Sequence, residues 1–135
     1  MTLRISLKDG EKMIVNGAVM RAVGRTDLVV ENHVALMRGR EVMAPDEATT
    51  PGRRLYFACM LAYIGGEAGM EAQREQIVTL LGDLVAAFEA DEPKAICARM
   101  ARRLAVGDYY RALGDCRGLI AYESQALARA ETQAA

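Results

Sequence analysis

Hydrophobic and polar residues alternate with a period of two at the start of the chain, which predicts short β-strands. In LRISLK, Leu3, Ile5 and Leu7 alternate with polar side chains. One face of this strand is therefore apolar, and the other carries Arg4 and Lys8.

Two further pairs of strands are predicted before residue 44. MIVNGAVM, residues 13–20, contains two β-prone runs separated by Asn16-Gly17, a strong hairpin signal because both positions accept a positive φ. DLVVEN and HVALMR, residues 27–38, predict a second pair that turns near Glu31-Asn32 and places His33 in a strand. We therefore expect four to five short antiparallel strands that end near Met43.

From residue 44 onward the apolar residues recur at helical spacing instead. Pro45–Ala48 is typical of a short helical turn, and longer helices are predicted over residues 51–64, 69–89, 92–106 and from 109 onward. Strands followed by helices predict an α+β fold: a small N-terminal antiparallel β-sheet with about four α-helices packed on it. We expect residues 1–135 to form a single domain with a β-rich part, 1–43, and a helical part, 44–130.

Composition narrows the class of protein. The chain has 135 residues, 52 % hydrophobic and 26 % charged, which is typical of one globular domain. Its longest apolar run, residues 55–64, is too short to span a bilayer, and the N-terminus lacks the apolar segment of a signal peptide. We therefore expect a cytoplasmic protein without membrane contact.

An odd number of cysteines without CxxC spacing predicts buried free thiols.

No arrangement of residues typical of an enzyme is found in the sequence. His33 is the only histidine, and no nucleophile motif accompanies it. The acidic residues at predicted helix starts are where carboxylates stabilise a helix electrostatically. IGGEAG, residues 64–69, lacks the Lys-Ser/Thr of a phosphate-binding loop. We expect no catalytic residue, no cofactor and no metal.

An unusual feature is the pair Arg53-Arg54 in the first turn of a predicted helix, after Thr50 as N-cap and Pro51. The positive end of the helix dipole disfavours each cation there by about 0.3–1 kcal/mol. One explanation is an ion pair with Asp46, Glu47 or a strand carboxylate. The other is that both arginines join the basic strands and hold phosphate groups, which suit a planar guanidinium.

The charge distribution permits an anionic partner without requiring one. Net charge is −1, yet residues 1–40 carry seven Lys or Arg against four acids. Near the other end, RMARRLAVGDYYRAL, residues 99–113, predicts either an ordinary antiparallel helix pair or a partner-binding helical surface. In the second case Tyr109, Tyr110 and Arg103 are the candidate partner-binding residues.

Three stretches together resemble the FlbT family of alphaproteobacterial proteins: ISLKDGEKMIVNGAVM, VMAPDEATTPGRRLYFACMLAYI and GDYYRALGDCRGLIAYE. The similarity extends over about residues 3 to 123, in the same order and spacing. The resemblance implies a post-transcriptional regulator that associates with the 5′ untranslated leader of flagellin mRNA. It would repress translation and promote mRNA decay during flagellum assembly, together with the small partner FlaF. The family implies no catalytic residue.

This resemblance leads to two hypotheses. In the first, the chain binds RNA through a basic patch. Because no Phe, Tyr or Trp precedes Tyr56, such binding is expected to be weakly sequence-specific or partner-dependent. In the second, the chain is an adaptor or chaperone-like factor whose helical face binds FlaF or flagellin, with an indirect effect on mRNA. The candidate RNA-binding residues are Arg53, Arg54, Arg38, Arg40, Arg4 and Lys8.

Overall fold

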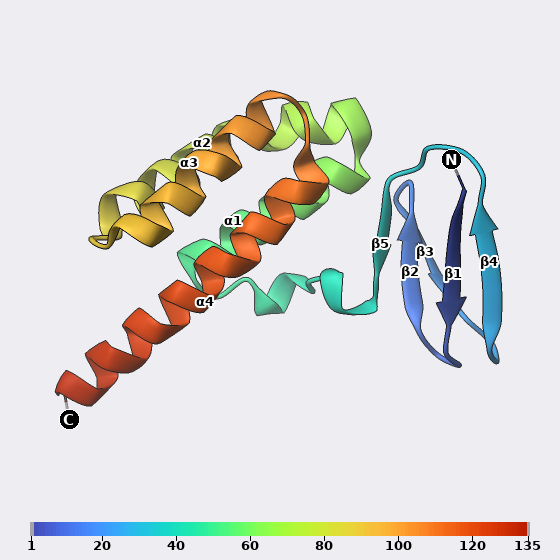
Figure 1. Ribbon diagram of the computed structural model, residues 1–135, viewed down its shortest axis with the longest axis horizontal. Helices are drawn as coiled ribbons and strands as arrows, with labels where there is room; N and C mark the ends of the chain where they lie inside the picture. Colours follow the sequence, from blue (N-terminus) through green and yellow to red (C-terminus); the bar gives the residue numbers. More distant parts are fainter. Residues whose placement is uncertain (1, 135) are drawn as a thin grey trace.

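The computed structural model describes residues 2–134 and separates strands from helices along the chain (Figure 1). The predicted α+β class is confirmed, with five strands and four α-helices in sequence order. Two 3-10 turns, Gly39–Glu41 and Pro45–Glu47, connect the two parts. The strands are β1 (Leu3–Leu7), β2 (Lys12–Val15), β3 (Ala18–Arg21), β4 (Thr26–Val30) and β5 (Leu36–Arg38), and the helices are α1 (Pro51–Ile64), α2 (Gly66–Ala87), α3 (Asp91–Ala105) and α4 (Tyr109–Ala134).

The strands form two antiparallel sheets. One contains β1 and β4, and the other has the order β3-β2-β5 with β2 in the centre. The predicted hairpin at Asn16-Gly17 is confirmed, since it joins β2 to β3 with φ angles of 48° and 86° at these two residues. Positive φ at both turn residues is the reason for Asn-Gly at this position.

The predicted pairing of residues 27–32 with 33–38 is wrong. β4 pairs with β1, and β5 pairs with β2. Asn16 fixes β5 in this position, because its backbone N–H donates to the Ala35 carbonyl at 2.8 Å and its Oδ1 accepts from the Ala35 N–H at 2.9 Å. His33 consequently lies exposed in the connection between β4 and β5, outside any strand.

The three-stranded sheet is the middle layer between the β1–β4 sheet and the helices (Figure 1). Successive side chains of β2 point to opposite faces and enter different cores. Met13 packs with Ile5 and Leu7 in the strand core, whereas Ile14 belongs to the helical core together with Met37 of β5. The helices therefore pack on the sheet through few side chains.

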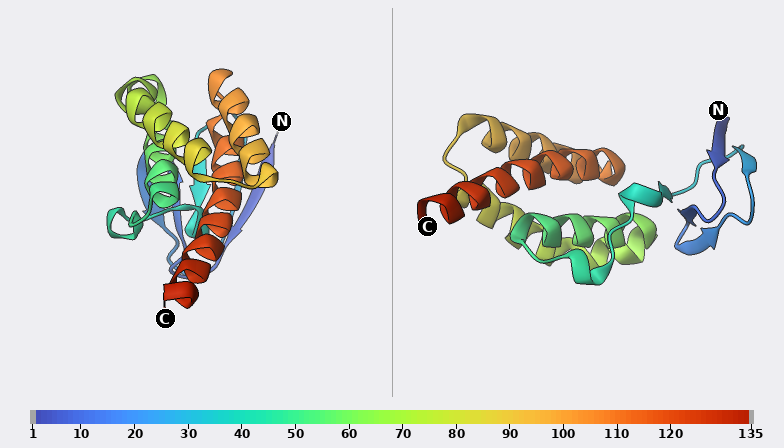
Figure 2. Two further views of the ribbon diagram at one scale, coloured as in Figure 1. Left: turned by 90° about the vertical axis from the view of Figure 1, so that its left-hand side faces the viewer. Right: turned by 90° about the horizontal axis from the view of Figure 1, so that it is seen from below.

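The helices form two hairpins, α1–α2 and α3–α4, joined by contact between α1 and α4 (Figure 2). α1 has the bounds that the sequence predicts, and Leu55, Cys59 and Ala62 on it are completely buried. α2 begins at Gly66, three residues before the predicted start at 69. No helix within residues 2–134 is both long and apolar enough to cross a membrane.

Three buried free thiols lie in the helical core, as the cysteine count predicts. Cys59, Cys97 and Cys116 are unpaired and belong to one hydrophobic cluster. Burial raises the pKa of the Cys59 thiol to about 12 and raises the pKa of the Cys97 thiol as well. Neutral thiols act here as small apolar core side chains.

A buried carboxylate joins the start of α1 to α4. Glu123 of α4 is 8 % exposed, and its Oε2 accepts from the Gly52 backbone N–H at 2.8 Å. Its Oε1 accepts from the Thr50 hydroxyl, whose oxygen in turn accepts from the Arg53 N–H at 3.2 Å. Gly52 leaves the necessary room, because a Cβ there would lie 2.9 Å from Glu123 Oε1. The carboxylate thus satisfies the Gly52 N–H directly, supports the Thr50 cap that binds the Arg53 N–H, and faces the positive dipole end of the helix.

We expect the substitution Glu123→Gln to lower the free energy of unfolding by about 1–3 kcal/mol. It removes the charge from a buried hydrogen-bonded group and leaves the α1 donors poorly satisfied. Urea unfolding followed by circular dichroism measures the change. Glu75→Gln on the exposed face of α2 is the matched control and is expected to change stability by less than about 0.5 kcal/mol. Equal midpoints for both variants would contradict the structural role of Glu123.

Candidate nucleic-acid interface

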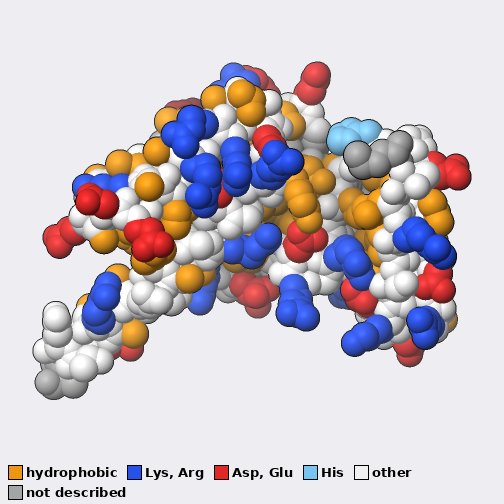
Figure 3. Space-filling model, viewed as in Figure 1, with side chains coloured by type: hydrophobic (Ala, Val, Ile, Leu, Met, Phe, Trp, Pro, Cys, Tyr) orange, Lys and Arg blue, Asp and Glu red, His pale blue; other side chains and the backbone are white. Residues whose placement is uncertain are grey.

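A groove of about 1160 Å³ lies at one end of the strands, where three connections meet. These are the β1–β2 loop, the β3–β4 loop and the 3-10 turn after β5. Lys and Arg side chains gather at this lower end of the strands in Figure 3. We call it the strand-end groove; its basic lining residues are Lys8, Arg25, Arg38 and Arg40, and its acidic ones are Asp9 and Glu11.

The two acidic side chains of the groove are used in holding its loops. Asp9 Oδ1 accepts from the Gly24 N–H at 2.8 Å, which joins the β1–β2 loop to the β3–β4 loop. Glu11 accepts from the Lys8 N–H at 3.1 Å and forms an ion pair with Arg38 at 3.3 Å. The pKa of the Glu11 carboxyl is lowered below its usual range, mainly by the hydrogen bond from the Lys8 N–H. Burial opposes this shift by raising the pKa, and the charge of Arg38 lowers the pKa further.

Three cations of the groove remain available for a ligand. Arg38 is held in the structure, since it also donates to the Ser6 carbonyl at 2.7 Å. Lys8, Arg25 and Arg40 are exposed, and within residues 2–134 none of them has a carboxylate at ion-pair distance. The groove therefore offers an excess of positive charge in a concave surface, as an anion-binding site requires.

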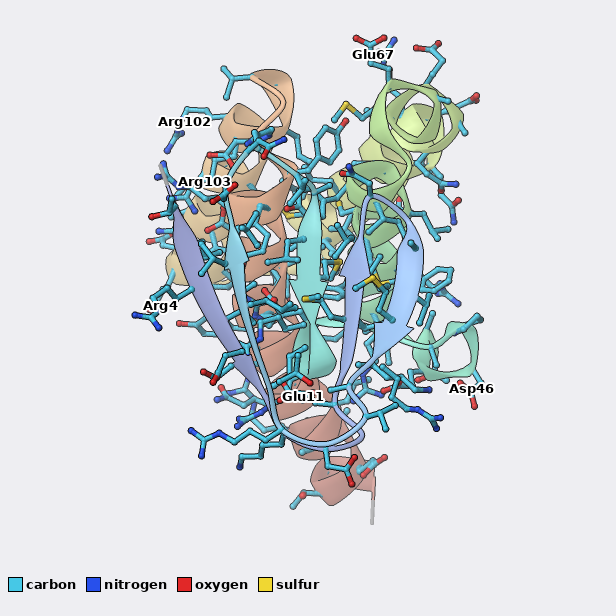
Figure 4. The ribbon with its side chains drawn as sticks, turned by 90° about the vertical axis from the view of Figure 1, so that its right-hand side faces the viewer. Arg4, Glu11, Asp46, Glu67, Arg102 and Arg103 are labelled. Atoms are coloured by element: carbon cyan, nitrogen blue, oxygen red, sulfur yellow. The ribbon has the colours of Figure 1, made fainter. Side chains whose placement is uncertain are left out.

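The structure brings together some of the predicted RNA-binding residues and not others. Lys8, Arg38 and Arg40 line the same groove. Arg4 lies on the solvent face of β1, opposite Val29, and points away from the groove (Figure 4). Arg25 is a lining residue that the sequence analysis missed. It lies far from Lys8 in sequence, and the pairing of β1 with β4 and of β2 with β3 brings the two loops together.

Arg53 and Arg54 do not line the groove, and the part of the chain that the structure describes shows no carboxylate within 4.0 Å of either guanidinium. The explanation by pairing with Asp46, Glu47 or a strand carboxylate therefore finds no support. Arg53 Nη1 donates instead to the Thr49 hydroxyl at 3.2 Å. The charge that opposes the dipole of α1 comes from Glu123 on α4, which local sequence patterns cannot reveal.

The three predicted partner-binding residues all have roles inside the fold. Tyr109 is 9 % exposed and belongs to the helical core. The Tyr110 hydroxyl donates to Glu41 Oε2 at 2.7 Å, and this hydrogen bond is the main cause that raises the pKa of Tyr110 to about 12. Its ring also lies 5.6 Å from that of Tyr63. Arg103 Nη1 is bound to Asp115 Oδ1 at 2.8 Å.

Asp115 joins α3 to α4 through two arginines. This carboxylate is 4 % exposed, and its Oδ1 accepts from both Arg99 Nε and Arg103 Nη1, each at 2.8 Å. Both arginines belong to α3, and Asp115 belongs to α4. The charges of Arg99 and Arg103 are thus partly neutralised within the protein, which favours the ordinary helix pair predicted for residues 99–113 over the partner-binding surface.

Glu41 determines how the strand-end groove lies relative to the helices. It ends the 3-10 turn that carries Arg40, and its Oε1 accepts from the Arg38 N–H at 3.1 Å. Its carbonyl accepts from the Tyr56 hydroxyl at 2.6 Å, so that α1 and α4 both hold this turn. Glu41 is a positioning residue that the sequence analysis did not identify.

Comparison with known proteins gives consistent similarities. The family described as "Flagellar protein FlbT" matches residues 3–127. The chain is 38 % identical over 128 residues to "Probable flagellum biosynthesis repressor protein FlbT" of Caulobacter sp. strain K31, covering 94 % of this chain and 97 % of that protein. It is 35 % identical to "Flagellum biosynthesis repressor protein FlbT" of Caulobacter vibrioides strain ATCC 19089, covering 94 % and 90 %. A similarly named protein of Agrobacterium fabrum is 38 % identical, covering 96 % and 87 %.

No solved structure matches the chain significantly. The similarities in sequence cover the strands and the helices alike, since the matched residues extend from β1 into the projecting part of α4.

We expect Arg103→Ala to lower the free energy of unfolding by about 1 kcal/mol, since it removes one of two charge-assisted hydrogen bonds to the buried Asp115 carboxylate. Arg102→Ala is the matched control, because Arg102 is exposed on the same turn of α3 and forms no ion pair within residues 2–134. Thermal and urea unfolding measure the stability of both variants. A result in which the two variants are equally stable would argue that Arg103 is free for a partner.

Proposed function

This chain belongs to the FlbT family of flagellar proteins, and we propose that it represses flagellin synthesis after transcription by associating with the 5′ untranslated leader of flagellin mRNA. Repression would consist of blocking translation and promoting decay of the message. The chain itself would contribute binding only, and cellular nucleases would degrade the exposed RNA. The names of its relatives as flagellum biosynthesis repressors support the repressor role.

The observation that supports RNA association most is the strand-end groove. Its exposed cations Lys8, Arg25 and Arg40 come from three different connections and face one concave surface. Such cations bind phosphates and release counterions from the RNA, which supplies affinity that depends on salt and hardly on sequence. Arg38 is less available because Glu11 already neutralises it.

The groove has no aromatic side chain among its lining residues. Sequence-specific recognition of single-stranded RNA commonly uses aromatic stacking, so the groove alone would discriminate poorly between RNA sequences. We infer that specificity for the flagellin leader depends on RNA shape or on a second protein. FlaF is the candidate for this partner from the resemblance described above.

Arg53 and Arg54 are a second candidate contact for phosphates. Both belong to the first turn of α1, next to the connection that follows Arg40 and Glu41. Arg54 is exposed, and Arg53 is partly buried. Their guanidinium groups are suited to phosphate oxygens, and no ion pair within residues 2–134 competes for them.

The second candidate function is the adaptor that binds FlaF or flagellin through its helices. It is favoured by apolar side chains exposed on α2, where Val78 is 66 % and Val85 42 % exposed. Under this alternative the effect on mRNA is indirect, and the purified chain does not bind the leader. A titration with RNA distinguishes the two functions directly.

We expect the triple variant Lys8→Ala, Arg25→Ala, Arg40→Ala to bind flagellin leader RNA at least about tenfold more weakly than the unchanged chain. The slope of log Kobs against log salt should fall in magnitude by about 2, since each phosphate contact on a single strand contributes about 0.7. Gel-shift titrations at several salt concentrations measure both quantities. They should include a scrambled leader, with and without FlaF.

The control for this triple variant is Arg102→Ala, Arg111→Ala, Arg129→Ala, which removes the same charge from exposed positions on α3 and α4. It is expected to change the salt slope little. If both triple variants behave alike, binding reflects overall charge alone. If the unchanged chain does not bind the leader even with FlaF, direct RNA association is wrong and the adaptor function is favoured.

We expect the double variant Arg53→Ala, Arg54→Ala to fold with a stability within about 0.5 kcal/mol of the unchanged chain, because neither side chain has a carboxylate partner within residues 2–134. RNA affinity and the salt slope should both fall. Urea unfolding and the same gel-shift assay measure the two effects. A double variant that unfolds would instead assign these arginines a structural role.

A further inference from the structure

The α2 and α3 helices leave an apolar groove of about 480 Å³ between them. Val78 and Val85 of α2 line it and are 66 % and 42 % exposed. The remaining lining side chains are mostly aliphatic or small, and none of the RNA-binding candidates belongs to it. We call this feature the α2–α3 groove; it is lined by Arg74, Ile77, Val78, Leu81, Gly82, Val85, Lys94, Cys97, Ala98, Ala101, Leu104, Ala105 and Tyr109.

The dimensions of this groove suit an α-helix. Along α2 its lining extends from Arg74 to Val85, which corresponds to about 16 Å at 1.5 Å per residue. Its walls include Gly82, Ala98 and Ala101, and such small residues allow the backbone of a further helix to approach closely. An exposed apolar groove of this kind is typical of a protein interaction site.

The last helix of the same chain ends in a segment that projects from the bundle. α4 continues beyond the helical bundle and projects from it (Figure 1), and the side chains of residues 124–133 are all exposed. These ten residues span about 15 Å, nearly the length of the groove. Leu127 is 49 % exposed, and Ala130 follows it on the same face of the helix.

Charges at the two surfaces are also complementary. Lys94 lies at the end of the groove where α3 begins, and Arg74 lies at the other end beside Tyr109. On the projecting helix, Glu131 follows Leu127 by four residues and therefore lies on the same face. A helix docked through Leu127 and Ala130 would bring this carboxylate near one of the two cations.

We propose that the α2–α3 groove binds the projecting end of α4, residues 124–133, from a second copy of this chain. The helix cannot enter the groove of its own chain, because α4 is continuous to Ala134 and leads away from the bundle (Figure 1). Reciprocal exchange between two copies fills both grooves around a twofold axis and leaves neither helix end free. This dimer goes beyond the proposed RNA association and does not depend on it.

Light scattering coupled to size-exclusion chromatography tests the proposal on the full chain. We expect a dimer that dissociates on dilution. Val78→Asp in the groove and Leu127→Asp on the projecting helix should each raise the dissociation constant at least tenfold. Thr79→Asp and Gln125→Asp are the matched controls, since both are exposed neighbours that do not belong to the groove or to the face of Leu127. The controls should leave the dimer intact.

Mixing the two dimer-weakening variants tests the exchange itself. The Val78→Asp copy retains its helix end, and the Leu127→Asp copy retains its groove, so the mixture should form a heterodimer with one of the two contacts. We expect the mixture to associate under conditions in which neither variant associates alone. A chain that stays monomeric up to about 100 μM, where even weak specific interfaces associate, would overturn the proposal. So would a dimer that the Leu127→Asp variant leaves unchanged, which would identify a different contact.

Discussion

The interaction on which the rest of the structure depends is the buried contact of Glu123 with the start of α1. It joins the last helix to the first and satisfies the Thr50 hydroxyl and the N–H of the buried Gly52. Because the carboxylate lies at the positive end of the α1 dipole, it also offsets the repulsion that Arg53 and Arg54 experience in the same turn. Both arginines can therefore remain without a salt bridge of their own within residues 2–134, which a helix end without this carboxylate would disfavour.

The position of the strands relative to the helices depends on the connection that leads into this end of α1. The chain enters α1 directly after the 3-10 turns, and Glu41 in the first turn is held by Tyr56 of α1 and Tyr110 of α4. β5 precedes that turn, and its Met37 is buried in the helical core beside Ile14 of β2. The loops that carry Lys8, Arg25 and Arg40 are consequently fixed relative to the helices, although few side chains connect the two parts.

Features that depend on local sequence were predictable, and those that depend on distant contacts were not. The Asn16-Gly17 hairpin and the bounds of α1 follow from turn and capping residues within a few positions of each other. The pairing of β4 with β1 and of β5 with β2 depends on which apolar faces meet, and alternating patterns are compatible with several partners. For the same reason the candidate residues proposed from the sequence included Lys8, Arg38 and Arg40 of the strand-end groove, but not Arg25, Glu41 or Glu123. The hydrogen bonds of Tyr110 to Glu41 and of Arg103 to Asp115 were not predictable either, because the spacing of residues does not reveal these partners.

The two proposed surfaces lie on different parts of the molecule, and together they would overcome the main weakness of the proposed RNA binding. A groove with three available cations and no aromatic side chain provides few contacts, so that one copy would bind RNA weakly. A dimer formed through the helices leaves both strand-end grooves uncovered, because the α2–α3 groove and residues 124–133 belong to the helical part. Two linked grooves bind one RNA strand at a high effective concentration, which raises affinity without any new type of contact. Under this proposal they would also require a leader whose phosphates reach both grooves at once, so that the shape of the RNA would supply the discrimination that base stacking does not.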